Sequence, residues 1–170
     1  MAHSTRAVVV TYIFHGPCSL FRSYTMKKHQ HTVTKIYRDF PAAHRQPKHD
    51  GHCRMVHGHN WGFDITFACQ KLDANGFVVD VGKLKKVKDF LTDKFDHTLL
   101  LNETDPLLLQ TKNWPPCKLV VVPNCGMEGL AKLVFDELNG MIKEIDNTKR
   151  GLEVVQVICW EDSKNSATYA

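Results

Sequence analysis

Residues 57–70 read His-Gly-His-Asn-Trp-Gly-Phe-Asp-Ile-Thr-Phe-Ala-Cys-Gln, and this stretch decides the fold. In its second part, aromatic and β-branched residues alternate with small or polar ones, which is typical of a half-buried β-strand. We expect Phe63, Ile65 and Phe67 to share one face of this strand. Trp61 is expected on the opposite face.

The histidines at the start of the stretch indicate a metal site. His57 and His59 are two residues apart, so a strand presents both on one face. His44 follows directly on another alternating stretch, residues 32–40, so it can converge with them. A single histidine is more often an ordinary surface or core residue, but three imidazoles at adjoining strand ends suit zinc. A zinc ion with three histidine ligands keeps a fourth position open, so we predict a catalytic Zn2+ site.

Cys53 lies four residues before His57 and has two alternative roles. A thiol near a divalent cation and imidazoles ionises more readily, which would make Cys53 a competent general base or nucleophile. The alternative is a fourth zinc ligand, and the site would then be closed and structural. We favour the catalytic role.

Two further sites carry groups suited to proton transfer or binding. Asp96 and His97 are adjacent just after a predicted helix, and a carboxylate beside an imidazole can relay a proton. The alternative is that the pair only complements the helix dipole. Glu161 ends a predicted strand, where its carboxylate could accept two hydrogen bonds from the amino-amide edge of a heterocycle. The alternative is an exposed strand-end acid.

The order of predicted elements is strand, strand, helix, helix, strand, strand. This order indicates an α+β fold, a four-stranded antiparallel sheet with two helices on one face. The uncovered face of such a sheet predicts an oligomer. Residues 99–116 are expected to be irregular, and residues 118–122 form a short additional strand. The expected strands are residues 32–40, 60–70, 152–160 and 167–170, and the expected helices are about 82–95 and 127–145.

Length and composition predict one domain. The chain has 170 residues, 43% of them hydrophobic, which suits a single core. Residues 1–25 are expected to be an N-terminal extension, with Met26 as an alternative start, and residues 26–170 the domain. The apolar run 7–14 is too short to span a bilayer and lacks the features of a secretory signal.

Charge and cysteine content indicate which classes of binding partner and which cellular compartment to expect. The net charge of +4 is scattered, which argues against nucleic-acid binding. The six cysteines are dispersed without a Cys-x-x-Cys pair, which favours reduced thiols and a cytoplasmic protein without membrane contacts.

Four motifs follow one another along the chain: Phe40-Pro-Ala-Ala-His44, Cys53-x-x-x-His57-Gly-His59, Phe95-Asp-His97 and Glu161. In this order they resemble the motifs of the 6-pyruvoyltetrahydropterin synthase and 6-carboxytetrahydropterin synthase superfamily, and the likeness covers residues 32–170. The resemblance implies that the three histidines hold catalytic zinc and that Cys53 is the proton-abstracting base. It also implies that Asp96 and His97 form the proton relay, and that Glu161 anchors a pterin ring and takes part in the relay.

The same resemblance implies an assembly and a substrate. In the tunnelling fold of this superfamily, trimers close twelve strands into a barrel and two trimers stack into a homohexamer with active sites between subunits. The implied substrate is 7,8-dihydroneopterin triphosphate. Its side-chain hydroxyls would bind zinc while the thiolate removes a carbon-bound proton and triphosphate leaves.

The spacing of the cysteine discriminates between subtypes. Three residues separate Cys53 from His57, as in the bacterial 6-carboxy-5,6,7,8-tetrahydropterin synthases, whereas the animal pyruvoyl enzymes have five. A glutamate in place of Cys53 would have indicated the folate-pathway subtype. The resemblance therefore implies a 6-carboxytetrahydropterin product with release of acetaldehyde, a step toward 7-deazapurines such as queuosine. The 6-pyruvoyl product is the alternative.

One segment departs from the superfamily pattern. Members usually carry Pro-Thr-Ser/Thr/Ala-Glu before the second helix, whereas this chain has Asn124-Cys-Gly-Met-Glu128. Glu128 keeps the acid and is a candidate substrate-binding residue, but the hydroxyl groups are gone. Backbone groups would then have to contact the pterin. A non-catalytic pterin-binding zinc protein is the alternative from a different functional class.

Overall fold

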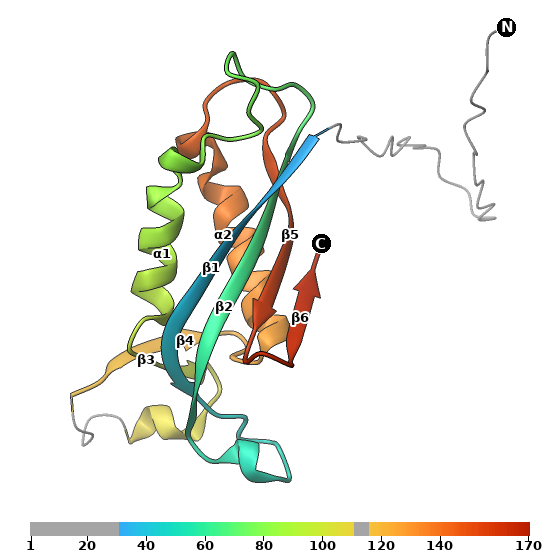
Figure 1. Cartoon of the computed structure of the whole chain (residues 1–170). Helices are drawn as coiled ribbons and strands as arrows, with labels where there is room; N and C mark the ends of the chain where they lie inside the picture. The colour runs from blue at the N-terminus through green and yellow to red at the C-terminus, as the bar shows by residue number, and fades with distance from the viewer. Residues whose placement is uncertain (1–30, 111–115) are drawn as a thin grey trace, which may run out of the picture.

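A computed structural model describes residues 31–110 and 116–170 of the chain (Figure 1). The predicted extension, residues 1–25, lies outside the described residues. The described part forms a curled six-stranded sheet in the order β4-β3-β1-β2-β5-β6, with two helices, α1 and α2. The strands are β1 (His31–His44), β2 (His57–Cys69), β3 (Thr98–Asn102), β4 (Lys118–Val122), β5 (Glu153–Trp160) and β6 (Ser166–Tyr169). The helices are α1 (Lys85–Phe95) and α2 (Met127–Ile145), and the short 3-10 helices are η1 (His52–Arg54), η2 (Val81–Lys83) and η3 (Pro106–Leu109).

The α+β class is confirmed, but the sheet is mixed and larger than predicted. Strands β1, β2, β5 and β6 pair antiparallel, as expected. The correction concerns β3 and β4, which extend the sheet beyond β1 through parallel pairings. Residues Thr98–Leu101 of β3 are all buried. A buried apolar strand shows no alternation, so the sequence pattern could not separate β3 from an irregular segment.

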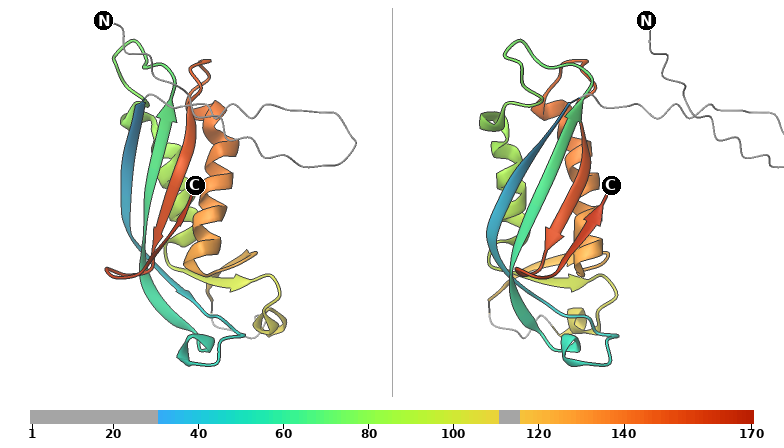
Figure 2. Two further views of the ribbon diagram at one scale, coloured as in Figure 1. Left: turned by 90° about the vertical axis from the view of Figure 1, so that its right-hand side faces the viewer. Right: turned by 45° about the vertical axis from the view of Figure 1, so that its right-hand side comes forward.

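Both helices pack on the same face of the sheet, and the two views of Figure 2 show this layer from the side. The apolar side chains of α2 recur every three or four residues, so they form one stripe toward the strands. α2 lies mainly against β5 and β6, and α1 contacts β1 and β3. No described helix is long and apolar enough to cross a membrane. The fully buried residues of the two stripes are Val87, Leu91, Phe95, Leu130, Ala131, Val134 and Leu138.

The position of Trp61 differs from the sequence-based expectation. Trp61 is fully buried, as are Phe63, Ile65 and Phe67. Residues two apart on a strand lie on the same face, so Trp61 belongs to the helix-covered face together with the other three. Its indole Nε1 donates to the carbonyl of Ala42 at 3.3 Å. This buried indole contacts the rings of His44 and His59 edge-on.

β1 contains a β-bulge between Tyr37 and Phe40. Tyr37 pairs with Phe63 and Phe40 with Trp61, so one extra residue of β1 is inserted between these pairs. Asp39 adopts a left-handed conformation there, with φ of 68°. A bulge bends its strand and redirects the neighbouring side chains. The bulge separates the first part of β1, which ends at Tyr37, from the last part, which runs from Phe40 to His44.

Candidate metal centre

The register of β1 and β2 brings the three predicted histidines together. His44 is the last residue of β1 and pairs with His57, the first residue of β2. His59 pairs with Ala42, so all three imidazoles emerge at the same end of the strand pair. Their ligand nitrogens lie within 4.8 Å of one another. This part of the sequence prediction is confirmed as a cluster that could hold a metal ion.

Hydrogen bonds fix which ring nitrogen is available in His44 and in His57. His44 Nδ1 donates to the carbonyl of Cys125 at 2.8 Å, and His57 Nδ1 donates to the carbonyl of Met55 at 2.8 Å. A carbonyl oxygen only accepts, so these Nδ1 atoms carry the protons and the Nε2 lone pairs are free. Nε2 of His44 and Nε2 of His59 are buried without a hydrogen-bond partner. A metal ion would satisfy both atoms, so the residues fit such an ion.

Burial keeps His44 in the form that binds metals. The residue is 2% exposed, and loss of hydration lowers the pKa of its imidazole from 6.5 to about 4. The hydrogen bond to the carbonyl of Cys125 raises this pKa, whereas the charges of His57 and His59 lower it. The ring is therefore neutral at physiological pH. Neutral imidazole is the ligand form, so binding at His44 requires no proton release.

Cys125 supports His44, a function that the sequence analysis did not find. Besides accepting from His44, it donates its thiol to the carbonyl of Arg45 at 3.1 Å and its N–H to Oδ1 of Asn102 at 2.8 Å. The side chain is fully buried, and burial raises the pKa of its thiol, which therefore stays a protonated donor. Cys125 belongs to the segment that departs from the superfamily pattern. No local sequence signal indicated this contact, because Cys125 and His44 are 81 positions apart.

Cys53 lies near the histidines in sequence but outside their cluster. It belongs to η1, between β1 and β2, is half-buried, and accepts at its carbonyl from Gln46 N at 2.7 Å. Among the described residues, its sulfur is not one of the atoms gathered with the three imidazoles. The arrangement therefore gives no support to Cys53 as a fourth ligand.

Asp96 and His97 form the expected hydrogen-bonded pair at the end of α1. His97 Nδ1 donates to Oδ1 of Asp96 at 2.7 Å, and the His97 side chain is 83% exposed. His97 has a φ of 56° and donates its N–H to the carbonyl of Pro41 at 2.8 Å, which turns the chain from α1 into β3. His97 and His59 both line a shallow hollow of about 390 Å³. The pair is thus formed, but it points outward from the chain.

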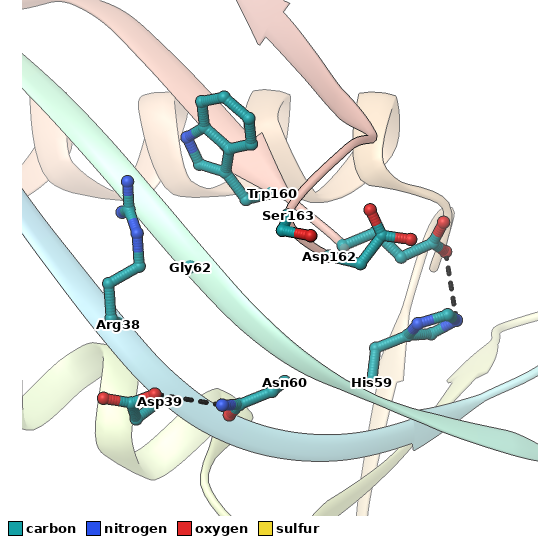
Figure 3. A pocket seen from close by; sticks show the side chains of 9 residues that line it. Arg38, Asp39, His59, Asn60, Gly62, Trp160, Asp162 and Ser163 are labelled. Carbon is teal, nitrogen blue, oxygen red and sulfur yellow. Dashed lines mark hydrogen bonds and ion pairs between the residues drawn. The ribbon is translucent and has the colours of Figure 1, made fainter.

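Glu161 is the acidic residue that the structure brings to both His44 and His59. It lies just after β5, and its Oε1 is 3.3 Å from His44 Nε2 and 3.5 Å from His59 Nε2. Figure 3 draws the contact to His59 as a dashed line. Glu128 lies in the first turn of α2 and is not among the groups of potential metal ligands in the described residues.

A cavity of about 630 Å³ opens beside Glu161 and His59 (Figure 3). Arg38, from the bulge of β1, donates to Oδ1 of Asp64 at 2.5 Å. Its guanidinium also stands 5.7 Å from the ring centre of Trp160, whose indole donates to Oδ2 of Asp64 at 2.9 Å. The cavity therefore combines an aromatic wall, a cation and several carboxylates. Sequence alternation alone could not predict it, because the bulge decides where Arg38 points.

Comparison with known proteins identifies the family. A family model described as 6-pyruvoyl tetrahydropterin synthase matches residues 32–170. The chain belongs to this family. The match covers every described strand from the second residue of β1 onward, so the histidine cluster lies inside the family domain.

Relatives with established names agree with this family. A 6-carboxy-5,6,7,8-tetrahydropterin synthase of Rickettsia typhi is 35% identical over 88 residues, covering 51% of this chain and 64% of that protein. The aligned part thus spans less than two thirds of the Rickettsia protein. A protein of the same name from Bacillus subtilis is 30% identical over 114 residues, covering 66% of this chain and 69% of that protein.

A solved structure supports the fold. The 6-pyruvoyl tetrahydropterin synthase of Plasmodium falciparum superposes with a TM-score of 0.61 over 81% of this chain and 96% of that chain. Its sequence identity to this chain is 18%, so the likeness concerns the fold. This chain and the Plasmodium protein therefore share one fold.

Proposed function

We propose that the protein is a zinc-dependent lyase. It converts 7,8-dihydroneopterin triphosphate to 6-carboxy-5,6,7,8-tetrahydropterin and releases acetaldehyde and triphosphate. The observation that carries the proposal is the cluster of three imidazoles, two of which, His44 and His59, have buried Nε2 atoms without a hydrogen-bond partner, in a chain of the 6-pyruvoyl tetrahydropterin synthase family. The curated relatives named 6-carboxy-5,6,7,8-tetrahydropterin synthase support the carboxy product.

His44, His57 and His59 would hold the zinc ion. A zinc ion bound there would supply a positive charge that polarises substrate oxygen atoms. The chain orients the ligands through the carbonyls of Cys125 and Met55, and the indole of Trp61 packs edge-on against the ring of His44, with the ring centres 5.0 Å apart. These contacts hold the rings before substrate arrives, so little reorganisation is needed on binding.

Proton transfer is assigned to the groups around this cluster. Cys53 removes a carbon-bound proton as a thiolate, and Asp96 orients His97, which passes protons on. Glu161 accepts hydrogen bonds from the amino-amide edge of the pterin and takes part in the relay, and Glu128 is a further substrate contact. Asp96 and His97 point outward from their own chain, which supports an active site completed by a neighbouring subunit.

We also propose a homohexamer built from two trimeric barrels. The parallel pairing of β3 with β1 covers only Ala42–His44. In the described part of the chain, residues 31–41 of β1 therefore form one free edge of the antiparallel part of the sheet, and β6 forms the other. Unpaired strand edges can pair with other chains, and pairing β1 of one copy with β6 of the next would close a ring.

The alternatives concern the product and the existence of catalysis. The pyruvoyl product is the closest alternative, because the family model carries that name. A non-catalytic pterin-binding zinc protein remains the alternative of a different class, since the segment 124–128 lacks the usual hydroxyl groups. A cytoplasmic step toward queuosine or another 7-deazapurine is the role that we propose in the cell.

The test is product identification by mass spectrometry after incubation of the zinc-loaded protein with 7,8-dihydroneopterin triphosphate. We expect 6-carboxytetrahydropterin together with acetaldehyde. A 6-pyruvoyl product would assign the alternative activity. Unchanged substrate after prolonged incubation with fully loaded protein would favour the binding protein.

The assignment of Cys53 is tested by Cys53→Ala. We expect turnover to be abolished while bound zinc stays near one ion per chain, because the thiol acts as a base and does not bind the metal. Zinc content is measured by elemental analysis and turnover by the mass-spectrometric assay. The exposed Cys117, changed to alanine, serves as the control for loss of a thiol elsewhere. Loss of zinc together with turnover would make Cys53 a ligand.

A further inference from the structure

We propose that Glu161 is the fourth ligand of the metal ion in the substrate-free protein, and that an incoming substrate oxygen displaces it. This role differs from gripping the pterin edge. Oε1 of Glu161 stands 3.3 Å from Nε2 of His44 and 3.5 Å from Nε2 of His59. Both nitrogens are buried without a hydrogen-bond partner. One carboxylate oxygen therefore faces two free ligand atoms.

The separations of Oε1 from the nitrogens of His44 and His59 are those of ligands that share one ion, unlike the sulfur of Cys53, for which no such separation is found among the described residues. Zinc bonds to nitrogen and carboxylate oxygen are about 2.0–2.2 Å, so ligands at the corners of a tetrahedron lie roughly 3.3–3.6 Å apart. Nδ1 of His44 already carries the proton that it donates to the carbonyl of Cys125. In the neutral ring, Nε2 has no hydrogen to offer Glu161, and the two lone pairs face each other. A cation placed between Nε2 of His44 and Oε1 of Glu161 would bind both lone pairs and remove this repulsion.

The neighbouring acid is less suited to this role. Asp162 also lies within reach of His59. Its carboxylate, however, accepts from Lys164 N at 2.7 Å, Asn165 N at 2.8 Å and Asn165 Nδ2 at 2.9 Å. These bonds hold the turn between β5 and β6. Asp162 is therefore committed to the turn, and Glu161 is the carboxylate free to bind a metal.

The exchange would link metal coordination to substrate recognition. With a metal ion bound, Glu161 would give up its place to a substrate hydroxyl, a ligand exchange that needs no oxidant or reductant. The released carboxylate can then accept hydrogen bonds from the pterin edge. This second step rests on the proposed function, whereas the resting ligand role requires only that the cluster binds a metal.

The test measures zinc affinity of the full-length protein by competition with a chromophoric chelator, without substrate. We expect Glu161→Gln to weaken zinc binding by at least roughly tenfold, because an amide oxygen is a poorer ligand than a carboxylate. Asp39→Asn is the charge-matched control. It removes one negative charge from the same cavity, and asparagine tolerates the left-handed conformation of this position. Its zinc affinity should stay within about twofold of the wild-type value.

A second readout uses the cobalt-substituted protein and its visible absorption spectrum. A carboxylate ligand does not titrate near neutrality, whereas a metal-bound water ionises near pH 7 in such sites. The wild-type spectrum should be constant between about pH 6 and 9. Glu161→Gln should acquire a spectral transition within that range as water replaces the carboxylate.

Three results would overturn the proposal, none of which involves turnover. One is equal zinc affinity and equal cobalt spectra for wild type and Glu161→Gln. Another is a wild-type cobalt spectrum that already titrates near pH 7. The third is a loss of affinity in Asp162→Asn that exceeds the loss in Glu161→Gln, which would move the ligand to Asp162. If Glu161→Gln fails to fold by circular dichroism, the wild-type cobalt titration decides. An inactive protein that still passes these metal tests would reject the proposed reaction and keep the ligand role.

Discussion

At the residue scale, the site depends on contacts that orient individual imidazoles. Cys125 accepts from Nδ1 of His44 through its carbonyl and donates its thiol to the carbonyl of Arg45. It therefore holds both the ligand and the residue after it. Partners of this kind fix the ring orientation and the tautomer of a metal ligand. The residues that surround the ligands consequently contribute to affinity without touching the metal.

Removing the Cys125 thiol should weaken metal binding. We expect Cys125→Ala to reduce zinc affinity by roughly tenfold, because the carbonyl that orients His44 loses its anchor on Arg45. Zinc affinity is measured by chelator competition. Cys69→Ala is a matched control, since Cys69 is also a fully buried free thiol and pairs with His31, at the end of the β1–β2 pair opposite His44. Equal affinities of the two variants would contradict the role of Cys125.

The burial of His44 should make the stability of the metal-free protein depend on pH. The folded ring takes up a proton only near pH 4, whereas the unfolded chain does so near 6.5. Between these values the unfolded state binds more protons at His44, so the stability that His44 contributes falls as the pH decreases from 6.5 to about 4 and is constant above 6.5. The loss attributable to His44 is up to about 3 kcal/mol.

Urea unfolding in the presence of a chelator tests this dependence. The wild-type free energy of unfolding should decrease between pH 7 and about 4.5, and His44→Gln should lose correspondingly less over the same interval. The variant cannot take up this proton on unfolding, whereas the other titrating groups remain. Parallel pH profiles for the two proteins would show that His44 does not cause the dependence.

At the element scale, the start of α2 is tightly packed against the segment that holds Cys125. A Cβ atom at Gly129 would lie 2.4 Å from Cβ and 2.5 Å from the carbonyl oxygen of Asn124. Real Cβ atoms do not approach backbone so closely, so any other residue at position 129 would force Asn124 or the start of the helix to shift. The helix N-terminus and the loop that supports His44 are thereby fixed relative to each other.

Two glycines of α2 should respond oppositely to the same substitution. We expect Gly129→Ala to destabilise the protein by roughly 1–3 kcal/mol, because the new methyl group forces Asn124 to move. Gly140→Ala is the control, since a Cβ there meets nothing within 4 Å, and it should stabilise the helix by up to about 1 kcal/mol. Thermal unfolding measures both changes. A stabilising effect of Gly129→Ala would refute the close contact.

At the scale of the whole molecule, the sheet has two strand edges that are available for pairing with another copy. β6 borders one side, and β1 is covered by β3 only over Ala42–His44. The helices cover one face of the sheet (Figure 2). A strand edge of this length supports pairing between copies. The outward direction of His97 fits an active site that a second copy completes.

The protein should therefore be a stable oligomer in solution. We expect a mass about six times the chain mass of 19.4 kDa in sedimentation equilibrium, independent of dilution over the micromolar range. The reason is that strand pairing around a closed ring of three copies leaves no free edge, and the stacking of two such rings doubles the mass. A monomeric mass at these concentrations would contradict the assembly.

The sequence by itself determined the α+β class, the two helices and the convergence of His44, His57 and His59. These features follow from local periodicity, since strand alternation fixes which residues share a face. Only the tertiary structure decided that β3 joins the sheet, because a fully buried strand has no alternating pattern. The tertiary structure likewise brought Cys125 to His44 and Glu161 to the imidazoles. Such contacts join residues far apart in the chain, and the packing of the elements, which no local pattern encodes, sets their distances.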